Sequence, residues 1–430
     1  MKDRLVRGVR KYVPQKAVRG LEETYRRSRA KAVGARYGFP ARNLRVIAIT
    51  GTNGKTTTAV YLNEIMKAAG HKTALFTTAV IEVAGVRTLN ELNATVALTA
   101  QMQRFFRDAK KARVDYVILE VTSHSLVQHK LAGVPIECAI MTNLTQDHLD
   151  YHKTMDEYAA AKGMLFAAKP RFIVLNHDDE WFDYYNKFDA REHKITYGTD
   201  TLSEARISKV RLFKKGSEAE VVIDHQSRIE LATALPGKYN VYNMTAAASA
   251  AYLFHIGLEP IAEGIANVDA IPGRFERVQT SKAYDIVVDY AHTPDALEKV
   301  LETVKSITKN RTILVFGACG DRDKGKRPDM GAIAARLADR IFLTDEESYN
   351  EDPNQIRQMV MDGIALEGGE AKTEEIADRR DAIAKALKIA RKGDTVLITG
   401  MGHENFRIVN GERLPWNDGA VVRDLTGEKK

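Results

Sequence analysis

Short apolar runs alternate with segments of helical spacing from residue 45 to the end of the chain. The run over residues 45–50 leads into a glycine-rich turn, and residues 57–70 then show helical spacing that ends at Gly70. Residues 116–123 and 138–145 are two further β-rich runs, each followed by a helix-compatible segment. This order predicts an α/β fold with a mostly parallel, doubly wound sheet.

The pattern changes at two places along the chain. Three runs between residues 206 and 235 alternate polar and apolar positions, which predicts antiparallel strands at a sheet edge, and a helix is expected over residues 243–255. Strand and helix alternation restarts near residues 271–273. Since 430 residues exceed one hydrophobic core, we expect a central domain over residues 45–272 and a Rossmann-like C-terminal α/β domain over residues 273–430.

Positive charge is concentrated at the start of the chain. The net charge is +7, yet residues 1–45 hold 14 Lys and Arg against 3 Asp and Glu, so the remainder is −4. We interpret residues 1–44 as a basic helical arm. Such an arm can attract anionic lipid or nucleic acid. We favour a solvated segment docked through Leu5, Val9, Val13 and Leu21, and no nucleic-acid partner, because basic and aromatic residues do not interleave.

The two cysteines and the hydropathy pattern bear on the compartment. Cys138 and Cys319 both lie in apolar runs predicted as strands, which indicates buried thiols in a reducing compartment. No apolar stretch is long enough to cross a bilayer or to act as a signal peptide. We therefore expect a cytoplasmic protein without stable membrane insertion, and we take a monomer as the default.

A glycine-rich turn follows the first predicted strand directly and opens a helix. Backbone N–H groups of such a turn, together with the helix dipole, bind phosphate oxygens. Lys55 is placed to neutralise the β- and γ-phosphates, and the Thr56 hydroxyl is placed to ligate Mg²⁺. Ile49 stands where the standard loop has its first glycine, but the strand–loop–helix context still predicts ATP binding. The predicted loop residues are Gly51, Thr52, Asn53, Gly54, Lys55, Thr56 and Thr57.

Two further candidate metal ligands follow later strands. Glu120 ends the run over residues 116–120, and His148 comes shortly after the run that begins at residue 138. The carboxyl ends of parallel strands line one crevice, so both side chains can converge on the phosphate loop. A carboxylate and an imidazole beside a triphosphate are reasonable Mg²⁺ ligands, although Mg²⁺ prefers oxygen. Each residue alone is equally compatible with a structural hydrogen-bonding role.

The order of motifs resembles the Mur ligases, which build the peptide of bacterial cell-wall precursors. The resemblance extends from about residue 46 to the C-terminus, and the three motifs from residue 288 onward look most like the muramyl-tripeptide synthetase branch. The motifs are T-G-T-N-G-K-T-T (50–57), E-V-T-S-H-S-L (120–126), T-N-L-T-Q-D-H-L-D-Y-H (142–152), Y-A-A-A-K (158–162), G-K-Y-N-V-Y-N (237–243), P-G-R-F-E (272–276), V-D-Y-A-H-T-P-D (288–295), G-D-R-D-K-G-K-R-P (320–328) and G-M-G-H-E (400–404).

The resemblance assigns roles to individual residues. It implies that Lys55 binds phosphates and that Thr56, Glu120 and His148 serve two Mg²⁺ sites. Lys162 matches the family lysine that is carbamylated, which turns a cation into an anion able to bind Mg²⁺; taken alone, Lys162 would be a surface helix lysine. The nucleotide-side matches are Asn240 and Asn243 for adenine, Arg274 for phosphate, and Asp289 and His292 for ribose or nucleotide.

The implied reaction is ATP-dependent amide formation. A carboxylate attacks the γ-phosphate of ATP, and an amine then displaces phosphate from the acyl phosphate, so the enzyme is an ADP-forming acid–amino-acid ligase. This chemistry needs positioning and charge neutralisation more than a nucleophilic side chain. No Ser-His-Asp or Cys-His arrangement is evident. Water exclusion from the acyl phosphate predicts closure of the C-terminal domain.

The incoming amine is predicted from the stretch before residues 351–353. By resemblance Arg322 holds the carboxylate of the free amino acid, whereas the family's side-chain selector, D-N-P-R, is here D-E-E-S-Y-N without an arginine. Loss of that arginine disfavours meso-diaminopimelate and suits L-lysine or ornithine. The alternative is an acidic loop that only meets solvent. The predicted amine-side residues are Arg322, Asp345, Glu346, Gly400 and Glu404.

The carboxylate substrate is predicted to be a UDP-MurNAc-dipeptide. Ser123, His124 and Gln128 keep the family pattern, Lys130 replaces an arginine, and Thr99 lies where the family has T-T-P. About 45 residues precede the phosphate loop, too few for the UDP-binding first domain of the family, so we expect that domain to be truncated. A non-UDP peptide or a lipid-linked acceptor stays open, and the basic arm then matters.

Three other functions compete with this prediction. A folylpolyglutamate synthase is disfavoured by the D-H-L-D-Y-H and G-H-E motifs, and a cyanophycin-synthetase fragment by the absence of an ATP-grasp region. A non-catalytic nucleotide-binding partner subunit is disfavoured because Lys55, Glu120, His148 and Lys162 are all present.

Overall fold

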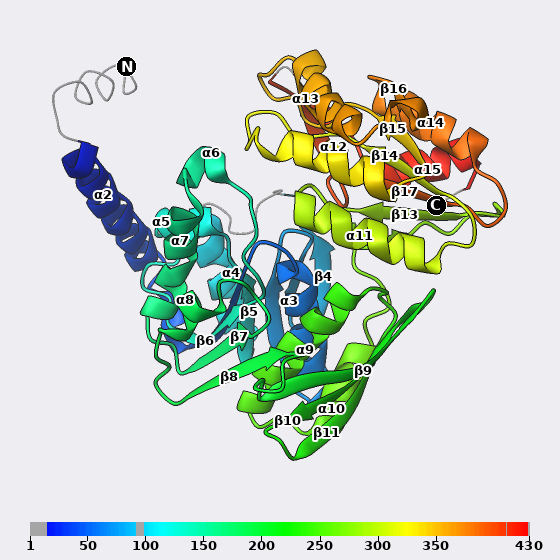
Figure 1. Cartoon of the computed structure of the whole chain (residues 1–430). Helices are drawn as coiled ribbons and strands as arrows, with labels where there is room; N and C mark the ends of the chain where they lie inside the picture. The colour runs from blue at the N-terminus through cyan, green and yellow to red at the C-terminus, as the bar shows by residue number, and fades with distance from the viewer. Residues whose placement is uncertain (1–14, 92–98, 410, 429–430) are drawn as a thin grey trace.

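The chain folds into two α/β bodies, as Figure 1 shows for this computed structural model. The structure describes residues 15–91, 99–409 and 411–428. Helix α2 (Gln15–Arg36) lies along the outer side of the central body, and the C-terminal body lies over the opposite end. Both bodies are sheets with helices on their faces, so the predicted fold class is confirmed.

Within the described residues, the central sheet has eleven strands in the order β11-β10-β9-β8-β7-β6-β1-β5-β2-β3-β4. In this spatial order, every pair of neighbours between β9 and β2 is parallel. The outer pairs, which involve β10 and β11 at one edge and β3 and β4 at the other, are antiparallel. The carboxyl ends of β1, β5 and β6 therefore meet at one edge, where the site is built. The strands are β1 (Arg45–Thr50), β2 (Thr73–Phe76), β3 (Val80–Val83), β4 (Val86–Leu89), β5 (Tyr116–Glu120), β6 (Ile136–Met141), β7 (Phe172–Asn176), β8 (His193–Gly198), β9 (Ala205–Phe213), β10 (Gly216–Ile223) and β11 (Ser227–Thr233).

Helices cover both faces of this sheet because its central strands are apolar on both sides. In β1, Ile47 and Ile49 pack toward α3, α9 and α10, whereas Val46 and Ala48 pack toward α4 and α7. The helices are α3 (Lys55–Ala68), α4 (Thr99–Lys111), α5 (Ser123–Val127), α6 (Leu149–His152), α7 (Met155–Ala167), α8 (Phe182–Asn186), α9 (Lys238–Leu253), α10 (Leu258–Ala266) and the 3₁₀ turn η1 (Pro40–Asn43).

The C-terminal body is a six-stranded sheet, ordered β12-β13-β17-β14-β15-β16, with a separate β18–β19 hairpin in the described chain. Helices α11, α12 and α13 cover one face, and α14 and α15 cover the other. The elements are β12 (Glu276–Arg277), β13 (Asp285–Asp289), β14 (Thr312–Phe316), β15 (Arg340–Leu343), β16 (Thr373–Glu375), β17 (Thr395–Thr399), β18 (Phe406–Val409), β19 (Glu412–Pro415), α11 (Pro294–Ile307), α12 (Lys326–Leu337), α13 (Pro353–Leu366), η2 (Glu370–Lys372), α14 (Arg379–Ile389) and α15 (Asp418–Thr426).

Several local predictions can be compared with these elements. The antiparallel edge is confirmed as β9–β11, and the helix expected from residue 243 begins earlier, at Lys238. The expectation for Cys319 was wrong: it lies in the loop after β14, because β14 ends at Phe316 and Gly317 packs against the Thr344 carbonyl. Cys138 is buried in β6 as predicted.

The boundaries at residues 44 and 272 stay predictions. The docking proposed for Leu5, Val9, Val13 and Leu21 concerns a backbone or side chains outside the described part of the chain. Among the helices that the structure describes, none is long and apolar enough to cross a membrane.

Close packing of α10 on α3 yields a test of the central core. A Cβ at Gly264 would lie 2.3 Å from the Ile65 Cα, so Gly264→Ala forces two helices apart. This overpacking should exceed the helix-propensity gain of about 1 kcal/mol and lower the free energy of unfolding by about 1–3 kcal/mol in urea titrations. Gly257 directly precedes the same helix and has no close backbone contacts, so Gly257→Ala should lower the free energy of unfolding by only a few tenths of a kcal/mol. Equal losses would contradict the packing argument.

Candidate active site

The phosphate loop joins β1 to α3, and its glycines are required by close neighbours. Gly51 and Gly54 have φ values of 147° and 84°. A Cβ at Gly51 would lie 1.8 Å from Thr142 Oγ1, and one at Gly54 would lie 2.2 Å from Asn243 Oδ1. Only glycine fits both positions. The tight turn therefore brings the N-terminus of α3 directly to the carboxyl end of β1, which is an anion-binding arrangement.

The loop after β6 fixes the shape of the phosphate loop. The Thr52 N–H donates to the Asn143 carbonyl, and the Asn53 N–H donates to Asn143 Oδ1, both at 2.9 Å. Thr142 Oγ1 donates to the Asn53 carbonyl at 2.6 Å. Residues 142–145 thus fix the conformation of the loop. Sequence reasoning had assigned no role to Thr142 or Asn143.

Two lysines lie at this loop without an anionic hydrogen-bond partner among the described residues. Lys55 Nζ donates to the Thr52 carbonyl at 2.6 Å, and Lys162 Nζ, on α7, donates to the Gly51 carbonyl at 2.7 Å. Burial lowers the pKa of Lys55. Lys162 is only 1% exposed, and burial together with Lys55 holds its pKa well below the usual range. Lys162 is therefore a buried amine whose protonation is disfavoured, unlike the surface lysine that the isolated sequence suggested.

Thr56 and Glu120 lie together beside the loop, as predicted. Thr56 Oγ1 donates to Glu120 Oε2 at 2.8 Å, and Thr78 donates to Glu120 through its N–H at 2.9 Å and its hydroxyl at 3.0 Å. Arg274, from the start of the C-terminal body, donates to Thr56 Oγ1 at 3.1 Å. Hydroxyl and carboxylate oxygens in this position are the donor type that Mg²⁺ prefers.

His148 lies in a group of aromatic and imidazole rings, of which those of His152 and Tyr158 are buried. Its ring centroid is 4.7 Å from that of His124, and His152 Nε2 is 2.8 Å from Ser123 Oγ. Burial lowers the pKa of His148 to about 3 and that of His152 to about 4. Both rings are neutral at physiological pH, which leaves a nitrogen lone pair for a metal or a proton donor.

The donor set fits Mg²⁺ only when other oxygens join it. No three His, Cys, Asp or Glu groups of the described chain converge closely enough to hold a metal by themselves. Glu120 has its oxygens engaged by Thr56 and Thr78, and His148 offers one nitrogen. Nucleotide phosphates and a carbamate on Lys162 would supply the missing oxygens, so Thr56, Glu120, His148 and Lys162 are compatible with the predicted metal role.

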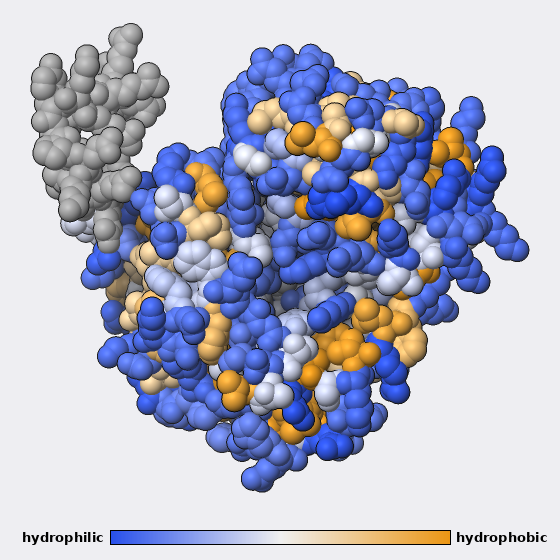
Figure 2. All heavy atoms as spheres, in the orientation of Figure 1, coloured by the Kyte–Doolittle hydropathy of each residue, from blue (hydrophilic) through white to orange (hydrophobic). Residues whose placement is uncertain are grey.

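Asp147 joins the two bodies across this site. Its carboxylate lies 3.3 Å from Lys326 Nζ of α12, 3.3 Å from His148 Nε2 and 3.9 Å from His292 Nε2. Burial opposes ionisation, but the neighbouring Lys326 and the two imidazoles hold the pKa of Asp147 well below its usual range. Figure 2 shows a hollow between the bodies that is bordered mainly by hydrophilic residues.

Further hydrogen bonds close the same junction. Asn53 Nδ2 donates to Asp295 Oδ2 at 2.7 Å, and Gln146 Nε2 donates to Asp323 Oδ2 at 3.1 Å. His403 Nε2 donates to the Thr78 carbonyl at 3.1 Å. The C-terminal body is therefore held directly against the phosphate loop.

The residues predicted to contact the nucleotide differ in what they touch: Asn243 contacts the phosphate loop, whereas Asp289 and His292 bond mainly to nearby backbone groups. Asn243 contacts the phosphate loop at Gly54, and its amide donates to Asn240 Oδ1 at 3.2 Å. Asp289 accepts the backbone N–H groups of Phe275 and Ala291 at 2.7 and 2.8 Å, so its oxygens shape the segment that joins the bodies. The ribose role inferred for Asp289 stays a prediction. His292 Nδ1 donates to the Tyr290 carbonyl, which turns Nε2 toward Asp147.

The amine-side predictions lie in a second cluster, built from the loop before α12, the loop after β15 and the loop between β17 and β18. The Arg322 guanidinium lies 5.1 Å over the Tyr349 ring, and the Tyr349 hydroxyl donates to Glu347 Oε2 at 3.0 Å. Glu404 accepts from the Tyr290 hydroxyl at 3.1 Å. Burial, with the other carboxylates nearby, holds the pKa of Glu404 well above its usual range. The cluster is thus short of positive charge.

Glu346 and Gly400 touch inside this cluster. A Cβ at Gly400 would lie 2.2 Å from Glu346 Oε2, so glycine is required there. Glu346 is 5% exposed, and Oε2 has no hydrogen-bond partner within the described chain. Burial raises the pKa of Glu346 to about 7.

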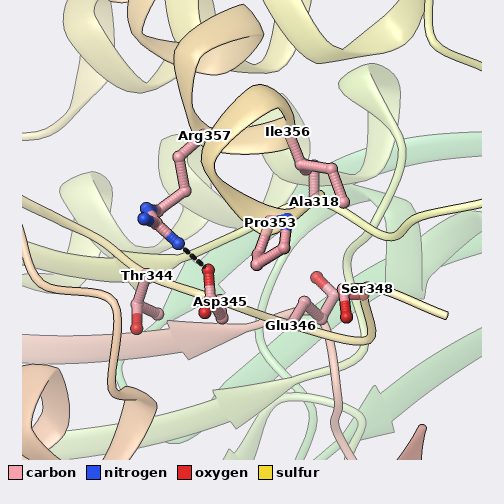
Figure 3. A pocket seen from close by; sticks show the side chains of 8 residues that line it. All are labelled: Ala318, Thr344, Asp345, Glu346, Ser348, Pro353, Ile356 and Arg357. Atoms are coloured by element: carbon pink, nitrogen blue, oxygen red, sulfur yellow. Dashed lines mark hydrogen bonds and ion pairs between the residues drawn. The ribbon is translucent and has the colours of Figure 1, made fainter. Parts of the chain in front are cut away.

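Asp345 was predicted to contact the substrate, but its charge is already neutralised by Arg357 of the same chain. Figure 3 shows Asp345 paired with Arg357 of α13, while Glu346 and Ser348 lie on the other side of the same loop. Arg357 also donates to Glu375 at 2.7 Å. The gap between these residues is too narrow for a water molecule. The substrate role of Asp345 stays a prediction with little support from this geometry.

The carboxylate-side predictions lie on the central body, on and beside the short helix α5 and at the start of α4. Ser123 and His124 begin α5, Gln128 follows its last residue, and Lys130 is half-buried, which lowers its pKa. Thr99 is the first residue of α4, and its side chain lies outside the described part.

Sequence reasoning missed several of the residues that organise the site. Asp147 and Lys326 lie within quoted motifs but were given no role, and Glu347 and Tyr349 lie in the stretch that was examined for an arginine. Their closeness in the chain to the predicted site residues His148, Arg322 and Glu346 was the signal that could have identified them.

Comparisons with known proteins place the chain in a family. The model of the Mur ligase middle domain matches residues 49–251, and that of the Mur ligase glutamate ligase domain matches residues 273–402. The UDP-N-acetylmuramoyl-L-alanyl-D-glutamate–2,6-diaminopimelate ligase of Geobacillus kaustophilus is 40% identical over 412 residues, covering 94% of this chain and 83% of the relative. That of Solibacter usitatus is 38% identical over 418 residues, covering 96% and 83%.

Solved structures agree with this placement. A structure of a UDP-N-acetylmuramoyl-L-alanyl-D-glutamate–2,6-diaminopimelate ligase is 35% identical, with a TM-score of 0.62 over 89% of this chain and 78% of that one. The folylpolyglutamate synthase of Mycobacterium tuberculosis has a TM-score of 0.71 over 94% and 96%, at 18% identity, which indicates a shared fold only.

The fold and site thus define an ATP-using acid–amino-acid ligase. The chain belongs to the Mur ligase family. Like its relatives, it is an ADP-forming ligase that makes a C–N bond, and the muramyl-tripeptide synthetase branch suggested by its motifs is the branch of its listed relatives.

The buried Glu346 carboxyl predicts a pH-dependent stability. Because its pKa in the folded state is about 7, above the ordinary carboxyl value, its contribution is present in acid and is lost as the pH rises through about 7. We expect the free energy of unfolding in urea to fall by about 3 kcal/mol more between about pH 5 and about pH 8 in the wild type than in Glu346→Gln. The exposed Glu412→Gln should behave as the wild type, and identical slopes for all three proteins would refute the assignment.

Proposed function

We propose that this ligase adds a diamino acid, L-lysine before others, to a UDP-MurNAc-dipeptide-like carboxylate in peptidoglycan precursor synthesis. The observation that carries the choice of amine is the cluster of Glu346, Glu347 and Glu404 beside Arg322. Arg322 suits the α-carboxylate by bidentate pairing, and the carboxylates suit a distal ammonium group. The printed names of the relatives support the UDP-linked dipeptide.

Each end of the hollow has a role in the proposed reaction. The phosphate loop, Lys55 and Arg274 bind and neutralise the ATP phosphates at Thr56, and Asn240 and Asn243 lie toward the base. Mg²⁺, held by Thr56, Glu120, His148 and carbamylated Lys162 together with phosphate oxygens, would supply further charge neutralisation at the transferring phosphoryl group.

The two organic substrates would approach the phosphates from different elements. Ser123, His124, Gln128 and Lys130, with Thr99, would orient the acceptor carboxylate toward the γ-phosphate. Arg322 and Gly400 would then hold the amino acid so that its amine meets the acyl phosphate. The closed junction at Asp147 and Lys326 would exclude water from this intermediate. We further propose a cytoplasmic monomer.

meso-Diaminopimelate is the second candidate amine. The relatives' printed names favour it. Arg407 also lies near Asp345, and its buried Nε has no hydrogen-bond partner in the described chain. This arginine comes from β18 rather than from the selector stretch, so it was not considered from the sequence.

A ligation assay tests the proposed substrates. Phosphate release from Mg²⁺-ATP with UDP-MurNAc-L-Ala-D-Glu should require an added amino acid and should favour L-lysine over ornithine and meso-diaminopimelate in competition. Glu347→Gln should lower kcat/KM for lysine on the order of tenfold, because a charge-assisted contact is lost. Glu412→Gln, exposed on β19, is the matched control, and Lys55→Ala should abolish release. Preference for diaminopimelate would overturn the choice of lysine. Absence of phosphate release with every amine would overturn the proposal that the acceptor is a UDP-MurNAc-dipeptide.

Carbamylation of Lys162 is tested separately. The neutral form of an amine reacts with CO₂ whereas the protonated form does not, and burial lowers the pKa of Lys162, so carbon-13 bicarbonate should give a carbamate signal in NMR spectra of the wild type. Lys162→Arg, which keeps Lys326 and every other buried lysine, should lack that signal and lose ligase activity. The same signal in Lys162→Arg would place the carbamate on a different lysine.

A further inference from the structure

A strongly basic surface covers one side of the central body and has no part in the proposed reaction. It comprises α2 from residue 24 onward, η1 and α4. Residues 24–45 contain no acid, and residues 99–113 contain only Asp108. The cations of these two stretches are Arg26, Arg27, Arg29, Lys31, Arg36, Arg42, Arg45, Arg104, Arg107, Lys110, Lys111 and Arg113.

These cations form one continuous surface rather than two. Helix α2 packs on α4, and the Arg104 guanidinium donates to the Tyr37 hydroxyl at 3.2 Å just beyond the end of α2. Arg107 lies 6.0 Å over the same tyrosine ring. All of the cations except Arg26 are exposed, and so is Tyr25, at 64%.

The extent of the surface decides between possible ligands. A single phosphate or diphosphate neutralises about two charges, whereas here twelve cations extend over two helices and a turn. The part of α2 that belongs to this surface, from residue 24 to Arg36, is about 20 Å long. An extended anionic surface matches this spread, and each Lys or Arg near anionic lipid contributes roughly 1 kcal/mol. An exposed tyrosine among cations is typical of the headgroup region.

We propose that α2, η1 and α4 form a docking surface for an anionic phospholipid bilayer. Docking is peripheral, since none of the described helices can cross a membrane. Arg27 Nε lies 3.3 Å from His129 Nε2, close to α5, so the surface adjoins the acceptor end of the site. Figure 1 shows α2 on the side away from the C-terminal body. The lipid therefore faces the acceptor end and leaves the C-terminal body free to move.

Vesicle sedimentation with the full chain tests the proposal. The protein should sediment with vesicles that contain phosphatidylglycerol but not with phosphatidylcholine vesicles, and high salt should release it because exposed charges are screened. Two variants remove charge from separate helices, and each should lower the vesicle partition constant at least tenfold. They are Arg104→Glu, Arg107→Glu, Lys110→Glu and Lys111→Glu on α4, and Arg27→Gln, Arg29→Gln, Lys31→Gln and Arg36→Gln on α2.

A matched control and a competitor complete the design. A third variant removes four exposed cations of the C-terminal body and should bind vesicles as the wild type does. Far-UV circular dichroism and ATP binding confirm folding of each variant. Equal loss in the control variant, or binding to both vesicle types, would overturn the proposal. So would double-stranded DNA displacing the vesicles at equal phosphate concentration, which would assign the surface to nucleic acid. The control changes are Lys309→Gln, Lys388→Gln, Arg391→Gln and Lys392→Gln.

Discussion

The buried carboxylate of Asp147 is the charge on which the arrangement of the two bodies depends. It meets Lys326 of the C-terminal body and the imidazoles of His148 and His292 at one point. A buried ion without a partner costs several kcal/mol, so either body alone would leave a charge uncompensated here. This contact therefore fixes how the two bodies align as well as holding them together. In the proposed reaction it lies where a water-sensitive intermediate must be protected.

Around this junction the site is built from charges that the protein itself leaves unbalanced. Lys55 and Lys162 donate to backbone carbonyls of the phosphate loop rather than to a carboxylate, and in the second cluster burial, together with Glu347 and Glu346, raises the pKa of Glu404. In the proposed reaction, ligands of opposite sign complete both ends: phosphates at one and an ammonium group at the other. Binding energy at each end then comes from relieving a deficit that folding created.

Local sequence signals carried much of the prediction. The phosphate loop was predictable because its glycines and its place between a strand and a helix are encoded within eight residues. Glu120 was predictable because carboxyl ends of parallel strands share an edge. The pairing of Asp345 with Arg357 was not, because it depends on how α13 packs after the loop. Asp147 and Lys326 are 179 positions apart in the chain, and no pattern of hydrophobic and polar positions in the sequence indicates that they meet. Cys319 was misplaced because an apolar run does not reveal where its strand ends.

The hydrogen bond from His403 to the Thr78 carbonyl has a kinetic consequence. Thr78 also holds Glu120, and Glu404 follows His403 directly in the chain. One short relay thus joins the phosphate end of the hollow to the amine end. Opening one end strains the hydrogen bond that helps to hold the other, so we expect the two ends to be coupled by roughly the 1 kcal/mol that such a bond contributes.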